Sequence, residues 1–264
     1  MPAAHKTVIS FGLVAIPISM FTATQDNDIH FNQLHREDGG RIKYKKTCSH
    51  CGQEVGPGDI VKGFQYDRDH YVTVTDEELE SLKSERDRTI QILHFAQLDQ
   101  ISPVYYERTY QAVPEPGGEK AFELLRAALM AEQKVAIGKT VMGNSEVLMC
   151  IVPRQEGVLI STMYFAAEVK QLQRTYQRPE IADAEMTMAR ALINSMNVPY
   201  DPQQYRDEYQ QRLRELIEAK IAGKEVTAPR EEQPSNIINL MDALKASIEQ
   251  QQAGNGDEGG RRGA

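Results

Sequence analysis

Residues 135–166, VAIGKTVMGNSEVLMCIVPRQEGVLISTMYFA, contain three short apolar runs separated by glycine-containing polar turns. Runs of this length are too short for most helices and are typical of β-strands. Six further runs of the same kind lie upstream, between residues 8 and 113. Together they predict an all-β or barrel-like body. The predicted strands are Val8–Ile16, Arg41–Thr47, Ile60–Tyr66, Tyr71–Val74, Thr89–Leu98, Tyr105–Val113, Val135–Met142, Val147–Pro153 and Val158–Ala166.

Two helices are predicted within this body. Thr75 is followed three residues later by Glu78, which is the capping box that satisfies free backbone amides at a helix start. Further along, Phe122, Leu125 and Leu129 recur at helical spacing after a turn that is rich in proline and glycine. We expect this second helix to pack on the strands, so the predicted fold class is α+β with a β-barrel core over residues 1–179.

The last third of the chain has the longer apolar periods of helices. Residues 180–223 are predicted to form a helical arm of two helices, Ile181–Met196 and Pro202–Ala222, and Gly223 ends the second. Residues 224–234 are polar, contain two prolines and predict a linker. A final helix over residues 235–250 either binds a partner or docks on its own chain, and residues 251–264 are expected to be disordered. The apolar face of that helix consists of Ile237, Ile238, Met241, Leu244 and Ile248.

Composition is that of a soluble globular protein, with 41% hydrophobic and 26% charged residues. No uninterrupted apolar segment is long enough for a membrane-spanning helix, and the N-terminal residues do not resemble a signal peptide. Three cysteines argue against a disulfide framework and favour a reducing compartment. The sequence therefore predicts a cytoplasmic protein.

The net charge of −8 argues against nucleic acid as a partner, but the charges are unevenly distributed. Residues 180–264 hold 15 acidic and 10 basic side chains, whereas Arg41, Lys43, Lys45 and Lys46 lie close together with no acid among them. On a strand, Arg41, Lys43 and Lys45 would share one face, and such a row suits the regular charge of a duplex backbone. The alternative is the solubilising outer face of an exposed strand.

Cys48 and Cys51 have the spacing of half a zinc knuckle, and structural zinc takes four ligands. Cys150 is distant in sequence, and His35 or His70 would have to be brought in by the fold. In a homodimer, a second copy of the pair could complete four sulfur ligands. The other interpretation is a reduced, metal-free pair of turn cysteines, so no cofactor is assigned. A thioredoxin-like redox motif is disfavoured because glycines and a proline follow the pair instead of a helix.

Motifs of common enzymes are missing. The sequence contains no phosphate-binding loop, no dinucleotide-binding fingerprint, no nucleophile elbow and no zinc-protease motif. Acidic pairs such as Glu77 with Glu78 and Glu231 with Glu232 occur at a helix start and in the linker, where they cap or solvate. We therefore predict no catalytic residues and a protein that is not an enzyme.

Several segments, in the same order, resemble the bacterial Ku family. The first is Val8–Pro17, VISFGLVAIP, followed by Phe31–His35, by Ile42–Lys46 leading into the cysteine pair, and by Ile60–Tyr66. Residues 119–129 and 205–220 are similar to the family as well. The resemblance covers about residues 6–250 and is more specific than any one motif.

The resemblance implies a β-barrel whose long excursion, about residues 35–71, forms with its dimer mate a bridge around double-stranded DNA. Such a homodimer would bind DNA ends in non-homologous end joining, independently of sequence, and would be associated with the nucleoid. The implied DNA-binding residues are Arg41, Lys43, Lys45, Lys46 and Lys62. The helix at residues 235–250 would recruit and stimulate the ATP-dependent DNA ligase D.

One departure limits the resemblance. Some family members carry a lysine-rich C-terminal extension, whereas this chain ends in a Gly/Gln tail with only Arg261 and Arg262. Extra DNA affinity from such a tail is therefore not expected. Two other classes stay open on the sequence: an operator-binding regulator with a zinc knuckle, and a metal-dependent nuclease. Sequence-dependent binding with bound metal would favour the first, and cleavage of end-labelled DNA with Mg²⁺ or Mn²⁺ would favour the second.

Overall fold

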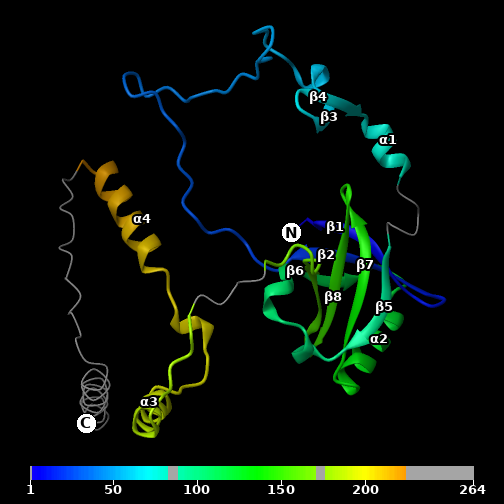
Figure 1. Ribbon diagram of the computed structural model, residues 1–264, viewed down its shortest axis with the longest axis vertical. Helices are drawn as coiled ribbons and strands as arrows, with labels where there is room; N and C mark the ends of the chain where they lie inside the picture. The colour runs from blue at the N-terminus through cyan, green and yellow to red at the C-terminus, as the bar shows by residue number, and fades with distance from the viewer. Residues whose placement is uncertain (1, 83–88, 171–175, 224–264) are drawn as a thin grey trace. The chain divides into compact units, whose positions relative to one another are not determined.

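The computed structural model describes residues 2–82, 89–170 and 176–223 (Figure 1). Its contacts divide the chain into two units, residues 1–172 and residues 173–264. The first unit holds the strands and the first two helices, and the second holds the two remaining α-helices. The strands are β1 (His5–Phe11), β2 (Val14–Thr22), β3 (Lys62–Asp67), β4 (His70–Val74), β5 (Ile90–Ala96), β6 (Tyr106–Pro114), β7 (Val135–Met142), β8 (Ser145–Arg154) and β9 (Gly157–Met163). The α-helices are α1 (Asp76–Ser81), α2 (Glu119–Ala131), α3 (Asp183–Ser195) and α4 (Glu208–Ile221).

Seven strands form a closed barrel in the order β1-β2-β6-β9-β8-β7-β5. Neighbours pair antiparallel except at the closure, where β1 and β5 run parallel and Ile9 lies opposite Ile90. Closure leaves no unpaired edge in the barrel, which removes the usual site of sheet-to-sheet aggregation. The predicted barrel is therefore confirmed, and β7 has the same bounds as its prediction.

The barrel interior is the main hydrophobic core. Inward-facing side chains such as Ile16, Ile18 and Met149 are almost completely buried. Helix α2 packs on β2 and β8 and adds Phe122 and Leu129 to this core, as its apolar spacing predicts. A second, smaller cluster lies on the outside of the barrel wall and consists of Val135, Ile137, Cys150, Val152 and Met163. Residues 96–106 supply part of its cover.

The N-terminal prediction is wrong in one respect. Val8–Ile16 is not one strand but the turn region of the β1–β2 hairpin, in which Phe11 lies opposite Val14. Gly12 has φ +60°, a left-handed conformation that glycine adopts without steric cost. The apolar residues continue through this turn, and Leu13 at its tip is fully exposed. Periodicity alone therefore merged two strands into one.

Between β2 and β5 the chain makes a long excursion that carries β3, β4 and α1. The strands β3 and β4 form a separate two-stranded sheet. The predicted capping box at the start of α1 is confirmed, because the Thr75 amide donates to Glu78 Oε2 at 2.8 Å and the Glu78 amide to Thr75 Oγ1 at 3.2 Å. The basic residues of the sequence analysis lie in this excursion.

The second unit contains α3 and α4, both close to their predicted positions. The second predicted helix starts late: Pro202–Gln204 is a short 3₁₀-helix, and α4 begins only after Asp207, whose carboxylate accepts the Gln210 amide. The predicted linker, final helix and tail at residues 224–264 lie outside the described residues. Among the helices that are described, none is both long and apolar enough to cross a membrane.

Candidate nucleic-acid interface

The basic stretch Arg41–Lys46 connects two small hairpin-like turns. In the first turn the Ile42 amide donates to the Gln33 carbonyl at 3.0 Å, and in the second the Val55 amide donates to the Lys46 carbonyl at 2.9 Å. The ends of the stretch therefore pair with different neighbours, and only isolated bridges form, Leu34 with Arg41 and Thr47 with Glu54. The predicted strand Arg41–Thr47 is wrong, because no neighbouring segment pairs along its whole length.

All five predicted DNA-binding side chains are exposed, but three of them are engaged within the chain. The Arg41 guanidinium donates to the side-chain oxygen of Asn32. Lys45 Nζ lies 2.8 Å from Glu54 Oε2, and Lys62 Nζ lies 2.5 Å from Asp76 Oδ1 in the first turn of α1. Lys43 and Lys46 form no ion pair with any residue that the structure describes. These two lysines are the cations most available to a phosphate.

The turn between Lys46 and Val55 contains the cysteine pair. The Cys48 amide donates to the Gln53 carbonyl and the Gly52 amide to the Cys48 carbonyl, both at 2.8 Å. The backbone amides of Cys51 and His50 point at the Cys48 sulfur, and together with the Cys51 thiol they lower its pKa. Amides directed at a sulfur favour the thiolate, the form that binds metal.

The structure does not bring the other candidate metal ligands to this pair. His35 Nδ1 lies 2.9 Å from Asp38 Oδ1, His70 Nδ1 lies 2.9 Å from the Arg68 carbonyl, and Cys150 is buried in the barrel wall. In the described part of the chain, no group of three or more His, Cys, Asp or Glu side chains could hold a metal ion. One copy therefore supplies two sulfur ligands at this turn.

The β3–β4 sheet adds a feature that the sequence did not predict, an apolar face that no residue in the described part of the chain covers. Phe64 lies opposite Val72 and Lys62 opposite Val74, so these side chains share one face. Phe64 is 66% exposed and Val72 50% exposed. The opposite face presents Gln65, Thr73 and Tyr71, whose ring lies against Gly63. The segment Ile60–Tyr66 does not alternate regularly, since Lys62 shares the face of Phe64, and this division was therefore not visible in the sequence.

The predicted partner-binding residues Ile237, Ile238, Met241, Leu244 and Ile248 lie outside the described residues. Their assignment stays a prediction.

Comparison with known proteins identifies the family to which this fold belongs. Residues 10–188 match the family model for the Ku70/Ku80 beta-barrel domain. A relative from Lachnoclostridium phytofermentans named non-homologous end joining protein Ku is 64% identical over 249 residues, which is 94% of this chain and 97% of the relative. Proteins of the same name from Desulfitobacterium hafniense and Archaeoglobus fulgidus are 39% and 38% identical, and the matches span 87% and 99% of their lengths and 94% of this chain.

A barrel with a long excursion that carries a short basic stretch thus defines the class, the Ku β-barrel proteins. This chain belongs to the Ku family.

Proposed function

We propose that the protein binds the ends of double-stranded DNA as a homodimeric ring, without reading base sequence, and acts in non-homologous end joining of broken DNA. The observation that carries the proposal is the exposed basic stretch Arg41–Lys46 within the excursion of a Ku-family barrel. The protein is a structural clamp in this proposal and not an enzyme. It acts in the cytoplasm, at the nucleoid.

The basic stretch supports backbone binding. Between Arg41 and Gln53 there are four basic residues and no acidic one, so the local charge is positive on an acidic protein. Exposed lysines that contact phosphates position a protein on the duplex but carry no sequence information. Binding should therefore be nearly independent of sequence and should weaken steeply as salt rises.

The uncovered face of the β3–β4 sheet supports a homodimer. A two-stranded hairpin is marginally stable at best by itself in water, and large exposed apolar groups such as Phe64 are typical of interaction surfaces. A second copy that packs on this face would bury Phe64 and Val72 and would hold both basic stretches beside one duplex. The ring follows from pairing of the two excursions.

A ring predicts selection of ends by topology, because a closed ring can load only where the duplex stops. In a competition gel-shift assay, a linear duplex should displace the labelled linear probe, whereas a covalently closed circle of the same sequence should not. Equal competition by linear and circular DNA would contradict the ring. Strong dependence on the sequence of the linear competitor would instead favour an operator-binding regulator.

The C-terminal region is the proposed contact for the ATP-dependent DNA ligase D. Deletion of residues 235–264 should leave DNA-end binding intact and abolish stimulation of ligation. A second variant replaces Met241 and Leu244 by Ala in the full-length chain. It should also lose stimulation of ligation, although its length is unchanged. Stimulation that survives both changes would contradict this role.

The only zinc site that we propose is shared between two copies of the chain. Cys48 and Cys51 supply two thiolates, and the same pair of the second copy supplies two more. Zinc at such a site would be structural and would tie the two excursions together. Native mass spectrometry with and without a chelator reports dimer mass and metal count together. One zinc per dimer, absent from a Cys51→Ser variant, is the expected result, and a metal-free dimer would refute it.

A further inference from the structure

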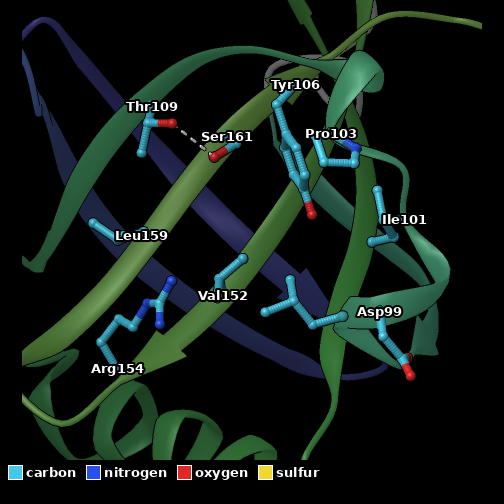
Figure 2. Close-up of a pocket in the computed structure, with 10 residues that line it drawn as sticks. Asp99, Ile101, Pro103, Tyr106, Thr109, Val152, Arg154, Leu159 and Ser161 are labelled. Atoms are coloured by element: carbon cyan, nitrogen blue, oxygen red, sulfur yellow. Dashed lines mark hydrogen bonds between the residues drawn. The ribbon is translucent and has the colours of Figure 1, made fainter. Parts of the chain in front are cut away.

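A pocket of about 610 Å³ lies on the outside of the barrel wall, away from the excursion in sequence (Figure 2). Strands β6, β8 and β9 form its floor, and the segment that precedes β6 overhangs one side. Its volume is within the usual range of ligand-binding pockets. The lining residues are Leu98, Asp99, Ile101, Pro103, Tyr106, Thr109, Val152, Arg154, Leu159 and Ser161.

The floor of the pocket is apolar and fixed in place. Val152 belongs to the buried cluster on the outside of the wall, and Leu159 and Ile101 pack against that cluster. The hydroxyls of Thr109 and Ser161 lie 2.9 Å apart and form one hydrogen bond, in which either can be the donor. A large apolar side chain placed on this floor would displace water without breaking a hydrogen bond within the protein.

Arg154 supplies a positive charge at one end of the pocket. Figure 2 shows its side chain directed toward Val152 and Leu159. Its backbone is held in place, because its carbonyl accepts a hydrogen bond from Arg126 Nη1 at 2.8 Å. The guanidinium itself makes no ion pair with the residues that the structure describes. A guanidinium can bind a carboxylate with two parallel hydrogen bonds.

Tyr106 supplies a buried hydroxyl that lies beside the Cys150 thiol. Its hydroxyl is buried and has no hydrogen-bond partner of ordinary geometry among the described residues. Burial, together with the neighbouring Cys150 thiol, raises the pKa of Tyr106 to about 12, so the hydroxyl keeps its proton.

The residues at the rim of the pocket favour a peptide over nucleic acid as the ligand. Leu98 and Val104, which are 42% and 54% exposed, extend the apolar surface outward, as at protein–protein contact sites. Asp99 stands at the edge of the pocket on the side away from Arg154 (Figure 2), so the negative group of a ligand would be directed to the Arg154 end. We propose that this pocket binds a segment of a partner protein in which a large apolar side chain is followed closely by a carboxylate, the apolar group on Val152 and Leu159 and the carboxylate on Arg154. This site is independent of DNA-end binding.

Fluorescein-labelled peptides can test the proposal on the full-length protein by fluorescence anisotropy. Each probe is a Gly/Ser peptide with a Leu-Phe pair and one Glu placed one, two, three or four residues after it. At least one spacing should bind saturably, and its Glu→Gln and its Leu-Phe→Ala-Ala versions should bind about tenfold more weakly. Failure of every spacing to bind, or equal binding of the Glu→Gln version, would overturn the proposal.

Two variants test whether the peptide binds at this pocket. Arg154→Gln should weaken the best peptide about tenfold and should no longer distinguish Glu from Gln in the probe. Leu98→Asp should weaken it as well, because it adds a negative charge beside the acidic peptide. The matched control Lys134→Gln removes an exposed cation outside the pocket and should change nothing. Normal peptide affinity in Arg154→Gln would refute the assignment of the peptide site to this pocket. If neither the wild type nor any variant binds linear DNA, that result would count only against the proposed DNA clamp.

Discussion

Lys45 Nζ forms an ion pair with Glu54 Oε2 at 2.8 Å, which joins the basic stretch to the turn that carries the cysteine pair. Both side chains are well exposed, so the pair adds little to stability. The ion pair makes Lys45 less available to a phosphate, whereas Lys43 and Lys46 have no carboxylate partner among the residues that the structure describes. The four cations of the stretch are therefore not equivalent toward a phosphate.

This difference predicts unequal effects of single lysine substitutions on DNA binding. Lys43→Gln and Lys46→Gln should each remove about one phosphate contact and reduce the slope of log K against log salt by about 0.9. Lys45→Gln should reduce it less, because Glu54 already neutralises this lysine. Fluorescence anisotropy of a labelled linear duplex over a salt series measures the slopes. Lys134→Gln, on the barrel, is the control, and identical slopes for all variants would show that the stretch is only a solvated surface.

The two faces of the β3–β4 sheet should be separable by mutation. Phe64→Asp places a charge on the apolar face and should shift the protein from dimer to monomer in native mass spectrometry, with loss of DNA-end binding. Gln65→Asp, one residue along on the opposite face, is the control and should preserve the dimer mass. If Phe64→Asp remains a dimer, the proposed homodimer contact lies elsewhere.

Local signals predicted most strands of the barrel, and in the excursion they predicted β3, β4 and α1 but failed at Arg41–Thr47. Val135–Met142 was predicted correctly because both of its neighbours pair along its length, so that strand pattern and structure agree. Arg41–Thr47 has a similar alternation but only isolated bridges at its ends, and pairing partners are not visible in a single segment. The pocket brings together Tyr106 and Arg154 from strands that are distant in sequence. No local sequence pattern could have predicted that these two residues line the same pocket.

Gly138 in β7 offers a direct test of barrel packing. A Cβ atom at this position would lie 2.8 Å from the Gln91 carbonyl oxygen of β5 and 3.1 Å from Ile90 Cγ2. The carbonyl belongs to a paired strand and cannot move freely, so Gly138→Ala should lower the free energy of unfolding by about 1–3 kcal/mol. Urea unfolding followed by circular dichroism measures this loss. Gly58→Ala is the control, since nothing lies within 4 Å of its Cβ position, and equal loss in both variants would contradict the packing argument.

Glu115 should make the stability of the barrel depend on pH. The Ser19 hydroxyl donates to its carboxylate and Lys6 Nζ lies 3.3 Å away, so the side chain connects the end of β6 to β1 and β2. The hydrogen bond from Ser19, then the hydrogen bond from Lys6 and last its charge, lower the pKa of Glu115 below its ordinary value. A lowered folded-state pKa means that the unfolded chain binds the proton more readily.

The lowered pKa of Glu115 determines in which direction stability changes with pH. The stabilisation by Glu115 is complete above the ordinary glutamate pKa of about 4.3 and is lost as pH falls through the lower folded-state value. Glu115→Gln should therefore lower Tm at pH 7, and the gap between variant and wild type should narrow as the pH falls below about 4.3. Thermal unfolding by circular dichroism at a series of pH values measures the gap. Ser19→Ala should show the same trend more weakly because Lys6 remains, and a gap independent of pH would mean that the carboxylate charge is not the cause.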